Sequence, residues 1–190
     1  MKDKNLIIIT GQLAAGKTSY GKKISEALKV PFYSKDSIKE ILFDSFANRN
    51  ADYETKRKIG ASSYSVFYYI IEEQMKVGKS IIAESNFVKE AIPIIKNLLE
   101  KYDYKCITIR FKGDLHILHE RFIKREYSNE RHNGLVANGR FDDFKDFEKT
   151  TIKANEFKIN NNEIIVDTTD FSKVNIDDII EKIKKYDVWI

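Results

Sequence analysis

The sequence predicts an α/β fold, a three-layer sandwich in which helices cover both faces of a five-stranded parallel sheet, within a single domain spanning residues 1–190. Two observations lead to this prediction. Five short apolar runs alternate along the chain with segments of helical periodicity, an order typical of parallel sheets. The first apolar run is followed by residues 11–18, Gly-Gln-Leu-Ala-Ala-Gly-Lys-Thr, which have the spacing of a phosphate-binding loop. That motif requires a strand before it and a helix after it, so the local and overall patterns agree.

The predicted strands occupy residues 6–9, 30–34, 80–83, 105–111 and 163–167. The second strand begins beside Pro31, and because proline has no N–H to donate, we expect this strand at an edge of the sheet. The third is a continuous apolar run, which is typical of a strand buried on both faces. We expect the third strand to lie beside the first.

Helical periodicity predicts helices over residues 18–29, from 36 to a polar connection at 47–53, over 54–77, up to 102, from 114, over 142–157 and over 175–186. Between residues 126 and 140 the pattern gives way to charged residues with Gly134 and Gly139. A stretch of this length without periodicity is uncommon in a compact domain unless it has a function, so we predict a mobile lid there.

Composition restricts the class of protein and its partners. Hydrophobic residues make up 42% and charged residues 33% of the chain, as in a globular protein, and no apolar run approaches the roughly 18 residues of a membrane span. Cys106 is the sole cysteine and the chain leads straight into its first strand, so we expect a cytoplasmic protein without a signal peptide. A net charge of +4 suits an anionic small ligand better than a long nucleic acid.

The phosphate loop predicts binding of a nucleoside triphosphate. Gly11 and Gly16 permit backbone angles that turn N–H groups inward as an anion site, at the positive end of the next helix. Lys17 supplies an ammonium group for the β- and γ-phosphates, and the Thr18 hydroxyl is a hard ligand for Mg²⁺. The residues predicted to bind the triphosphate are Gly11, Gln12, Leu13, Ala14, Ala15, Gly16, Lys17, Thr18 and Ser19.

In an open parallel sheet, ligands bind outside the carboxyl ends of the strands, and this rule selects Asp36. A carboxylate just after the second strand could take the proton from an acceptor hydroxyl. The alternative is that Asp36 caps the helix that follows.

The same rule selects Glu84 and Asn86 at the end of the third strand. Glu84 could hold Mg²⁺ through water or orient a nucleophile, and Asn86 could contact the substrate. An Asp would be more usual for the metal, and Glu84 could instead cap the next helix.

Arginines suit the charge that builds up on a transferring phosphoryl group. Arg121 and Arg125 lie one helical turn apart, and Arg131 and Arg140 follow in the predicted lid. The alternative is a solvated charged helix, because acidic residues are interleaved with these arginines.

Two further sets are weaker. Thr168 and Thr169, followed by Asp170 and Phe171, form the loop after the fifth strand and would lie near the nucleotide base; the alternative is that this loop is only a capped turn. Tyr64 and Tyr68 share a helix face and could line an acceptor site, although aromatic residues at this spacing more often belong to a core. His116, His119 and His132 do not form a convincing metal site, for want of a third ligand.

These residues together resemble a known family. The phosphate loop, the Ser-Lys-Asp-Ser-Ile-Lys-Glu stretch at 34–40, the Glu-Ser-Asn-Phe stretch at 84–87, the arginines of 121–131 and the Asp-Thr-Thr of 167–169 resemble small P-loop kinases. The similarity is to uncharacterised kinases related to polynucleotide 5′-kinase, chloramphenicol phosphotransferase and the zeta toxins, and it spans nearly the whole chain.

The resemblance implies a P-loop nucleoside triphosphate hydrolase fold with strand order 2-3-1-4-5. It also implies that Asp36 activates the acceptor, that Arg121 and Arg125 act as lid arginines, and that Thr168 and Thr169 lie near adenine. Lys39 falls where polynucleotide kinase has an acceptor-side arginine. Because lysine cannot make a bidentate phosphate contact, this departure weakens any claim of phosphate clamping there.

The predicted function is an ATP- and Mg²⁺-dependent kinase. Its predicted catalytic residues are Lys17, Asp36, Arg121 and Arg125; those contacting the nucleotide beyond the loop are Arg121, Thr168 and Thr169; those holding metal are Thr18 and Glu84; and those contacting substrate are Asp36, Lys39, Asn86 and Arg131. The sequence does not name the acceptor, although a small hydroxyl-bearing molecule is favoured. A nucleotide-regulated ATPase module and a nucleic-acid 5′-hydroxyl kinase stay open as alternatives.

Overall fold

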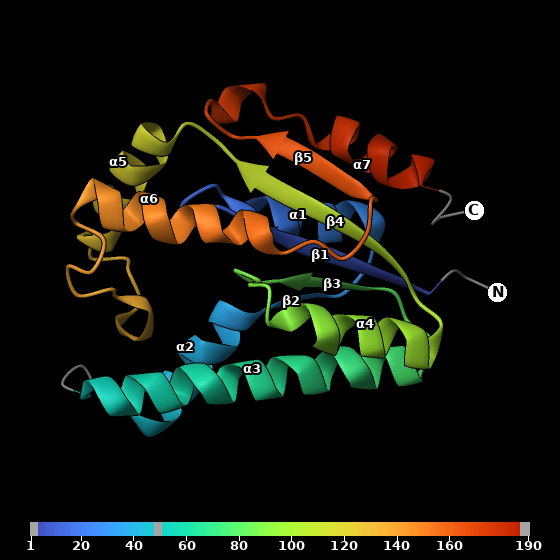
Figure 1. Ribbon diagram of the computed structural model, residues 1–190, viewed down its shortest axis with the longest axis horizontal. Coiled ribbons are helices and arrows are strands. Elements are labelled where there is room, and N and C mark those ends of the chain that lie inside the picture. The colour runs from blue at the N-terminus through green and yellow to red at the C-terminus, as the bar shows by residue number, and fades with distance from the viewer. Residues whose placement is uncertain (1–3, 48–50, 187–190) are drawn as a thin grey trace.

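The computed structural model describes residues 4–47 and 51–186 and places a parallel sheet at the centre of the molecule (Figure 1). Within these residues five strands lie in the order β2-β3-β1-β4-β5, and each neighbouring pair is parallel. The strands are β1 (Asn5–Gly11), β2 (Phe32–Ser34), β3 (Ile81–Glu84), β4 (Lys105–Lys112) and β5 (Glu163–Asp167). The predicted fold class, the strand order, the edge position of the strand after Pro31 and the pairing of the first and third strands are confirmed.

The helices follow the predicted pattern to within a few residues. They are α1 (Lys17–Leu28), α2 (Lys35–Phe46), α3 (Tyr53–Lys76), α4 (Ala91–Tyr102), α5 (Leu115–Glu126), α6 (Phe144–Ile152) and α7 (Ile176–Lys185). The helix expected over 142–157 is α6 followed by a short 3₁₀ turn, Lys153–Glu156. Part of the predicted polar connection at 47–53 lies outside the described residues.

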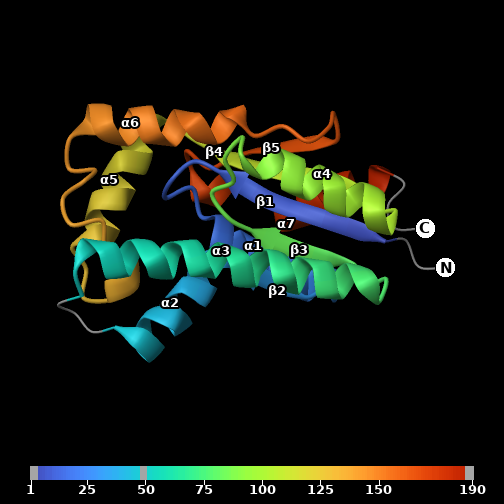
Figure 2. The ribbon, with the colours of Figure 1, turned by 60° about the horizontal axis from the view of Figure 1, so that its bottom comes forward.

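Alternation along β1 divides the interior into two cores. Ile7 and Ile9 belong to one buried cluster with residues of α1 and α7, whereas Leu6 and Ile8 belong to another with residues of α3 and α4. All of β1 is buried, as expected for a central strand covered on both faces. Figure 2 shows α3 and α4 in front of the sheet, with α1 and α7 behind it. No helix in the described residues is long and apolar enough to span a membrane.

The predicted functional segments lie together at the carboxyl ends of the strands. In the strand register, Glu84 is level with both Ile9 of β1 and Ser34 of β2. The phosphate loop, the start of α2 and the end of β3 therefore meet at the carboxyl ends of neighbouring strands. Helices α5 and α6 and the segment between them stand beyond these strand ends (Figures 1 and 2).

Arg110, in the middle of β4, fixes the chain that follows α6. It is 4% exposed, and its Nε donates to Glu163 Oε1 at 2.7 Å. Its two terminal nitrogens each donate at 2.5 Å, one to Ala154 O and the other to Phe157 O. Because a buried guanidinium needs this many acceptors, the return from α6 to β5 is tied to the sheet.

Gly11 marks a close approach between β1 and β4. Its φ is +128°, and a Cβ atom there would lie 2.0 Å from the carbonyl oxygen of Phe111. The next residue, Gln12, donates its N–H to that same oxygen at 2.9 Å. Only glycine fits this position, so the entry into the phosphate loop depends on it.

We predict that Gly11→Ala destabilises the protein by about 3 kcal/mol or more, because it combines a forbidden backbone angle with a clash against backbone. Urea unfolding followed by circular dichroism measures the change. Gly60→Ala is the matched control: it lies in α3, where the added Cβ meets only Lys39 Cε at 3.9 Å. That variant should gain about 0.5–1 kcal/mol from lower chain entropy and higher helix propensity. Equal effects of the two substitutions would contradict the packing argument at Gly11.

Candidate active site

The phosphate loop has the backbone of an anion site. Ala14 has φ 58° and Gly16 has φ 77°, both left-handed, and Gly16 is the N-cap residue of α1. No side chain caps that helix end, so the N–H groups of its first turn are available to a ligand. A positive φ at a non-glycine residue such as Ala14 costs free energy and is typical of a preorganised site.

Lys17 is buried and folds back over the loop. Its Nζ donates to the carbonyl oxygens of Gln12 at 2.6 Å and Gly11 at 3.2 Å. Burial lowers the pKa of Lys17 to about 8; Glu84 and Asp36 oppose this shift, and Arg125 adds to it. An anion that binds beside a buried lysine stabilises its charged form and raises its pKa again.

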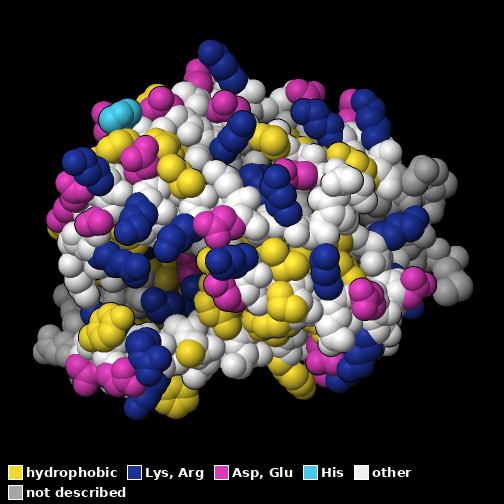
Figure 3. All heavy atoms as spheres, viewed as in Figure 1, with side chains coloured by type: hydrophobic (Ala, Val, Ile, Leu, Met, Phe, Trp, Pro, Cys, Tyr) yellow, Lys and Arg dark blue, Asp and Glu magenta, His cyan; other side chains and the backbone are white. Residues whose placement is uncertain are grey.

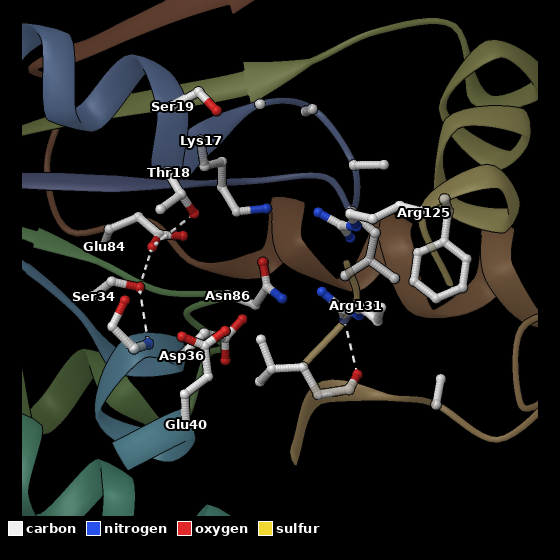
Figure 4. Close-up of a pocket in the computed structure, with 18 of the residues that line it drawn as sticks. Lys17, Thr18, Ser19, Ser34, Asp36, Glu40, Glu84, Asn86, Arg125 and Arg131 are labelled. Carbon is white, nitrogen blue, oxygen red and sulfur yellow. Dashed lines mark hydrogen bonds between the residues drawn. The ribbon is translucent and has the colours of Figure 1, made fainter. Parts of the chain in front are cut away.

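Glu84 is a buried carboxylate that joins the loop to the start of α2. Its Oε2 accepts from Ser34 Oγ at 2.6 Å and from Thr18 Oγ1 at 3.3 Å (Figure 4). Burial raises its pKa, against the attraction of Lys17. Glu84 does not cap the next helix, whose N-cap residue is Glu90. Its contacts are with the predicted metal-binding hydroxyl of Thr18.

Asp36 lies in the first turn of α2 and does not cap that helix. The N-cap residue is Ser34, whose Oγ accepts from Ser37 N at 3.5 Å. Asp36 is therefore free to line the cavity beside the phosphate loop. Burial would raise the pKa of Asp36, but the neighbouring ammonium groups, Lys35 above all, hold it below its ordinary value. The carboxylate stays ionised well into the acid range.

The cavity has a volume of about 350 Å³ and brings most of the predicted residues together. Figure 3 shows a hollow below α6 and above α2 with Lys and Arg side chains around it. Figure 4 shows Lys17 reaching in from one side, Arg125 and Arg131 from the other, and Asp36 from below. Predicted residues that line the cavity are Leu13, Ala14, Ala15, Gly16, Lys17, Thr18, Ser19, Asp36, Glu84, Asn86, Arg125 and Arg131.

Arg125 and Arg131 face the cavity in different ways. Arg125 has no carboxylate within ion-pair distance among the described residues, and partial enclosure followed by the like charge of Arg131 lowers its pKa. Arg131 donates from Nη2 to Leu135 O at 2.8 Å, and its Nε lies 3.5 Å from Glu126 Oε2. Arg125 is the less compensated of the two, which leaves it available to a phosphate.

Glu126 is a residue that the sequence reasoning missed. Its side chain is 2% exposed, and from the first position of the predicted lid it accepts the N–H of Ala137 and faces Arg131. Sequence shows it only as one acid in a charged stretch. Because a buried carboxylate must be hydrogen-bonded or paired, Glu126 holds the lid backbone and Arg131 in one arrangement.

Arg121 departs from the prediction that it steadies the transferring group together with Arg125. It does not line the cavity. Its Nη1 donates to Thr168 O at 2.6 Å, its Nη2 donates to Thr169 O at 2.7 Å, and its Cζ lies 3.9 Å from the centre of the Phe171 ring. The structure thus places Arg121 with the two threonines expected near the base, and away from Asp36.

Five other predicted residues also lie off the cavity wall: Gly11, Gln12, Lys39, Thr168 and Thr169. Lys39 runs between α2 and α3, with its Cε 3.9 Å from the Cβ position of Gly60. Burial and the nearby cations Lys35, Arg131 and Lys56 lower its pKa, and Asp36 opposes them. Gly11 and Gln12 form the base of the loop, where Gln12 Oε1 accepts from Gly113 N at 2.8 Å. Thr168 is fully buried and donates to Lys112 O.

The site has donors that suit a hard cation. The Thr18 hydroxyl and the Glu84 carboxylate lie 3.3 Å apart at the cavity wall, and such oxygen ligands are those that Mg²⁺ takes. In residues 4–47 and 51–186 no three His, Cys, Asp or Glu side chains are grouped to hold a metal ion. A cation here would therefore need further ligands from phosphate and water, which is how Mg²⁺ usually binds beside nucleotides.

Several solved structures are similar to this chain over nearly its whole length. A protein of Chloroflexus aurantiacus J-10-fl, described by inference as a kinase, has a TM-score of 0.86 and 26% identity over 97% of this chain and 98% of its own. A gluconokinase of Sinorhizobium meliloti 1021 has a TM-score of 0.56 and 17% identity over 96% and 90%. A shikimate kinase of Bacteroides thetaiotaomicron has a TM-score of 0.54 and 16% identity over 95% and 97%.

No protein-family model matches the chain. No curated protein matches it either. The structural neighbours confirm the predicted fold, and each of the three is itself described as a kinase. None of the three structures above is a polynucleotide kinase, a chloramphenicol phosphotransferase or a zeta toxin, so the narrower resemblance stays a prediction.

We predict that ADP binding at pH 8 takes up about half a proton, because Lys17 is then about half charged and a bound polyphosphate raises its pKa. Affinity should correspondingly fall as the pH rises above 8. Calorimetric titrations in two buffers of different ionisation enthalpy measure the uptake. Lys17→Arg keeps its charge and should show none. Equal uptake by both proteins would assign the proton to another group.

Proposed function

We propose that this chain is an ATP-dependent kinase that transfers the γ-phosphate of ATP to a hydroxyl of a small molecule. The observation that carries this proposal is the position of Asp36: an ionised carboxylate on the wall of the same cavity as Lys17 and the phosphate loop. A binding module has no need of a base opposite the phosphate site, whereas a kinase needs one to receive the acceptor proton.

The donor half is built from the loop and from the segment after β5. The loop amides and Lys17 would hold the β- and γ-phosphates, from Gly11 through Ser19. Arg121 is held by the carbonyls of Thr168 and Thr169 over the Phe171 ring, which leaves a flat cation as one wall for the base. These contacts support a position for the nucleotide base beside Arg121.

Thr18 and Glu84 would hold Mg²⁺, Thr18 through its hydroxyl and Glu84 directly or through water. When bound, the ion offsets the charge of the phosphates during transfer. The hydrogen bond from Ser34 keeps the Glu84 carboxylate oriented toward Thr18.

The transfer step uses residues on opposite walls. Asp36 accepts the proton of the acceptor hydroxyl, whose oxygen forms the new bond to the γ-phosphorus while the bond from that phosphorus to the ADP oxygen breaks. ADP leaves with that electron pair, and Asp36 later returns its proton to water. Arg125 and Arg131 stabilise the charge on the transferring phosphoryl group, and the Lys17 ammonium stays in contact with that group during transfer. The segment 126–140 acts as the lid that excludes water.

The acceptor half is formed by the first turns of α2, with Asn86 and Arg131 facing it and Lys39 behind it. Asn86 Oδ1 is shielded from solvent and has no hydrogen-bond partner among the described residues, so it is ready for a donor on the acceptor. The cavity of about 350 Å³ would take the terminal phosphates together with the hydroxyl end of an acceptor. The single cysteine, Cys106, is buried and free, in keeping with a cytoplasmic protein.

A nucleic-acid 5′-hydroxyl kinase is the second candidate. The Lys and Arg side chains around the hollow in Figure 3 favour it, since they would attract a phosphate backbone. Oligonucleotide binding that weakens steeply with salt would support this candidate over the small-molecule kinase.

We predict that Asp36→Asn lowers acceptor phosphorylation by about 10²–10⁴-fold, because the amide cannot take the proton. Nucleotide binding should be nearly unchanged. The assay follows ³²P from γ-labelled ATP into a panel of sugars, hydroxy acids, amino sugars, nucleosides and 5′-hydroxyl oligonucleotides. Asp178→Asn, an exposed carboxylate of α7, is the control and should behave as wild type. A slow rate of ATP hydrolysis that is changed neither by the acceptors of the panel nor by Asp36→Asn would favour the nucleotide-regulated module.

We also predict that substitutions of the two arginines of α5 affect different kinetic constants. Arg121→Gln should raise the KM for ATP about tenfold with little change in kcat, because Arg121 serves the base side. Arg125→Gln should lower kcat by about 10²-fold or more, because its charge meets the transferring group. Steady-state kinetics with varied ATP distinguishes them, and the reverse assignment would show that Arg121 turns toward the phosphates.

A further inference from the structure

Lys35, which the reaction outlined above does not use, makes a close ion pair with Asp36. Its Nζ lies 2.5 Å from Asp36 Oδ1. The Lys35 side chain is 12% exposed, whereas that of Asp36 is 41% exposed, with its open surface on the cavity. Lys35 therefore lies behind the carboxylate and not beside the acceptor, and it is absent from the cavity wall.

The ammonium of Lys35 is held in place from a different helix. It lies 5.0 Å from the centre of the Tyr64 ring of α3, within the range of a cation–π contact. Tyr64 is itself stacked on Tyr68 with ring centres 6.1 Å apart, and its hydroxyl receives the Ser85 Oγ hydrogen bond at 3.4 Å. A cation held by both an aromatic face and a carboxylate has little freedom to move.

We propose that Lys35 is a positioning residue for Asp36: it holds the Oδ1 oxygen, so that Oδ2 is left to receive the proton of the acceptor hydroxyl. This inference rests on the proposed kinase function. Among the described residues no hydrogen bond is made to Oδ2, and Asp36 lines the cavity while Lys35 does not. The geometry thus separates the two carboxylate oxygens by role.

The ion pair also sets when the proton moves. With its pKa held below the ordinary value, Asp36 is a weak base toward a free hydroxyl. The hydroxyl becomes acidic enough only as its oxygen bonds to the γ-phosphorus and the bond to ADP breaks. Asp36 then takes the proton late and releases it to water after ADP and product leave. A loose transition state, with little charge on the attacking oxygen, needs no stronger base.

Other charged groups also act on Asp36, and they limit what can be ascribed to Lys35. Those that face it are Lys17 from the phosphate loop, Lys39 and Glu40 from α2, Glu84 from β3, Arg125 from α5 and Arg131 from the segment after α5. Lys35 is the cation in direct contact, so its removal should have the largest effect on the carboxylate.

The test is Lys35→Met, which keeps the length and the apolar contact with Tyr64 but removes the charge. Burial of Asp36 is then less compensated, so its pKa rises by about one to three pH units, as expected on losing an opposite charge at contact distance. Two measurements follow it: carbon-13 NMR titration of the Asp carboxyl groups, with the Asp36 signal assigned from Asp36→Asn, and the pH profile of kcat. The acid limb of kcat should move up by the same amount.

Two further variants serve as controls. Lys35→Arg restores the charge and should return the Asp36 titration and the acid limb to low pH. Lys56→Met removes a half-buried lysine of α3 that acts on Lys39 and has no contact with Asp36. It should leave both measurements within about a few tenths of a pH unit, because Lys56 is not among the charges that act on Asp36.

The outcomes are distinct. An unmoved Asp36 titration in Lys35→Met would overturn the proposal, as would a higher acceptor KM at all pH values with an unmoved acid limb, which would make Lys35 an acceptor ligand. If the NMR titration shifts but no acceptor is phosphorylated by wild-type protein, the proposed kinase function fails while the ion pair stands. A shift in both measurements supports the positioning role.

Discussion

A buried carboxylate, Glu84, connects the two halves of this site. It accepts one hydrogen bond from Thr18, the first hydroxyl after the phosphate-loop lysine, and another from Ser34, the residue that caps α2. The helix that would hold the donor phosphates and the helix that carries Asp36 are thus fixed to the same oxygen at the end of β3. Because an ionised buried carboxylate without partners is costly, both contacts are needed for the carboxylate to stay there. Donor and acceptor positions therefore share a single reference point.

The sequence predicted what depends on local pattern. The phosphate loop was visible from its spacing, and Asp36 and Glu84 from their places after strands, since parallel strands end at one edge. The strand order came from the resemblance to small kinases and not from periodicity. The helix expected over 142–157 is found because Phe144, Phe147 and Thr151 recur at helical spacing, although α6 ends at Ile152 and a 3₁₀ turn follows it.

Long-range contacts decided what the sequence could not predict. Arg121 and Arg125 lie one turn apart on the same helix. Arg121, however, donates hydrogen bonds to carbonyl oxygens that lie 47 and 48 residues further along the chain. In the sequence, Glu126 is not distinguished from the acidic residues around it. Its role follows from the fold, in which the N–H of Ala137 donates to its carboxylate. Lys35 is adjacent to Asp36 in the sequence, but its buried position depends on the Tyr64 ring from α3. Each residue gains its role from a segment that periodicity cannot locate.

The division of positive charge explains why these cations are not equivalent. Lys35 is matched by Asp36 at 2.5 Å and Arg131 lies 3.5 Å from Glu126, so each is already largely compensated. Lys17 and Arg125 have no carboxylate at ion-pair distance in the part of the chain described, and burial or enclosure lowers the pKa of both. An unpaired, partly desolvated cation is unfavourable until an anion arrives, which concentrates the gain from polyphosphate binding on these two side chains. The compensated pair at Asp36 instead leaves its carboxylate ionised but only weakly basic. Under the proposed function, the same rule of local charge balance would give the donor side its affinity and the acceptor side a base that acts only during transfer.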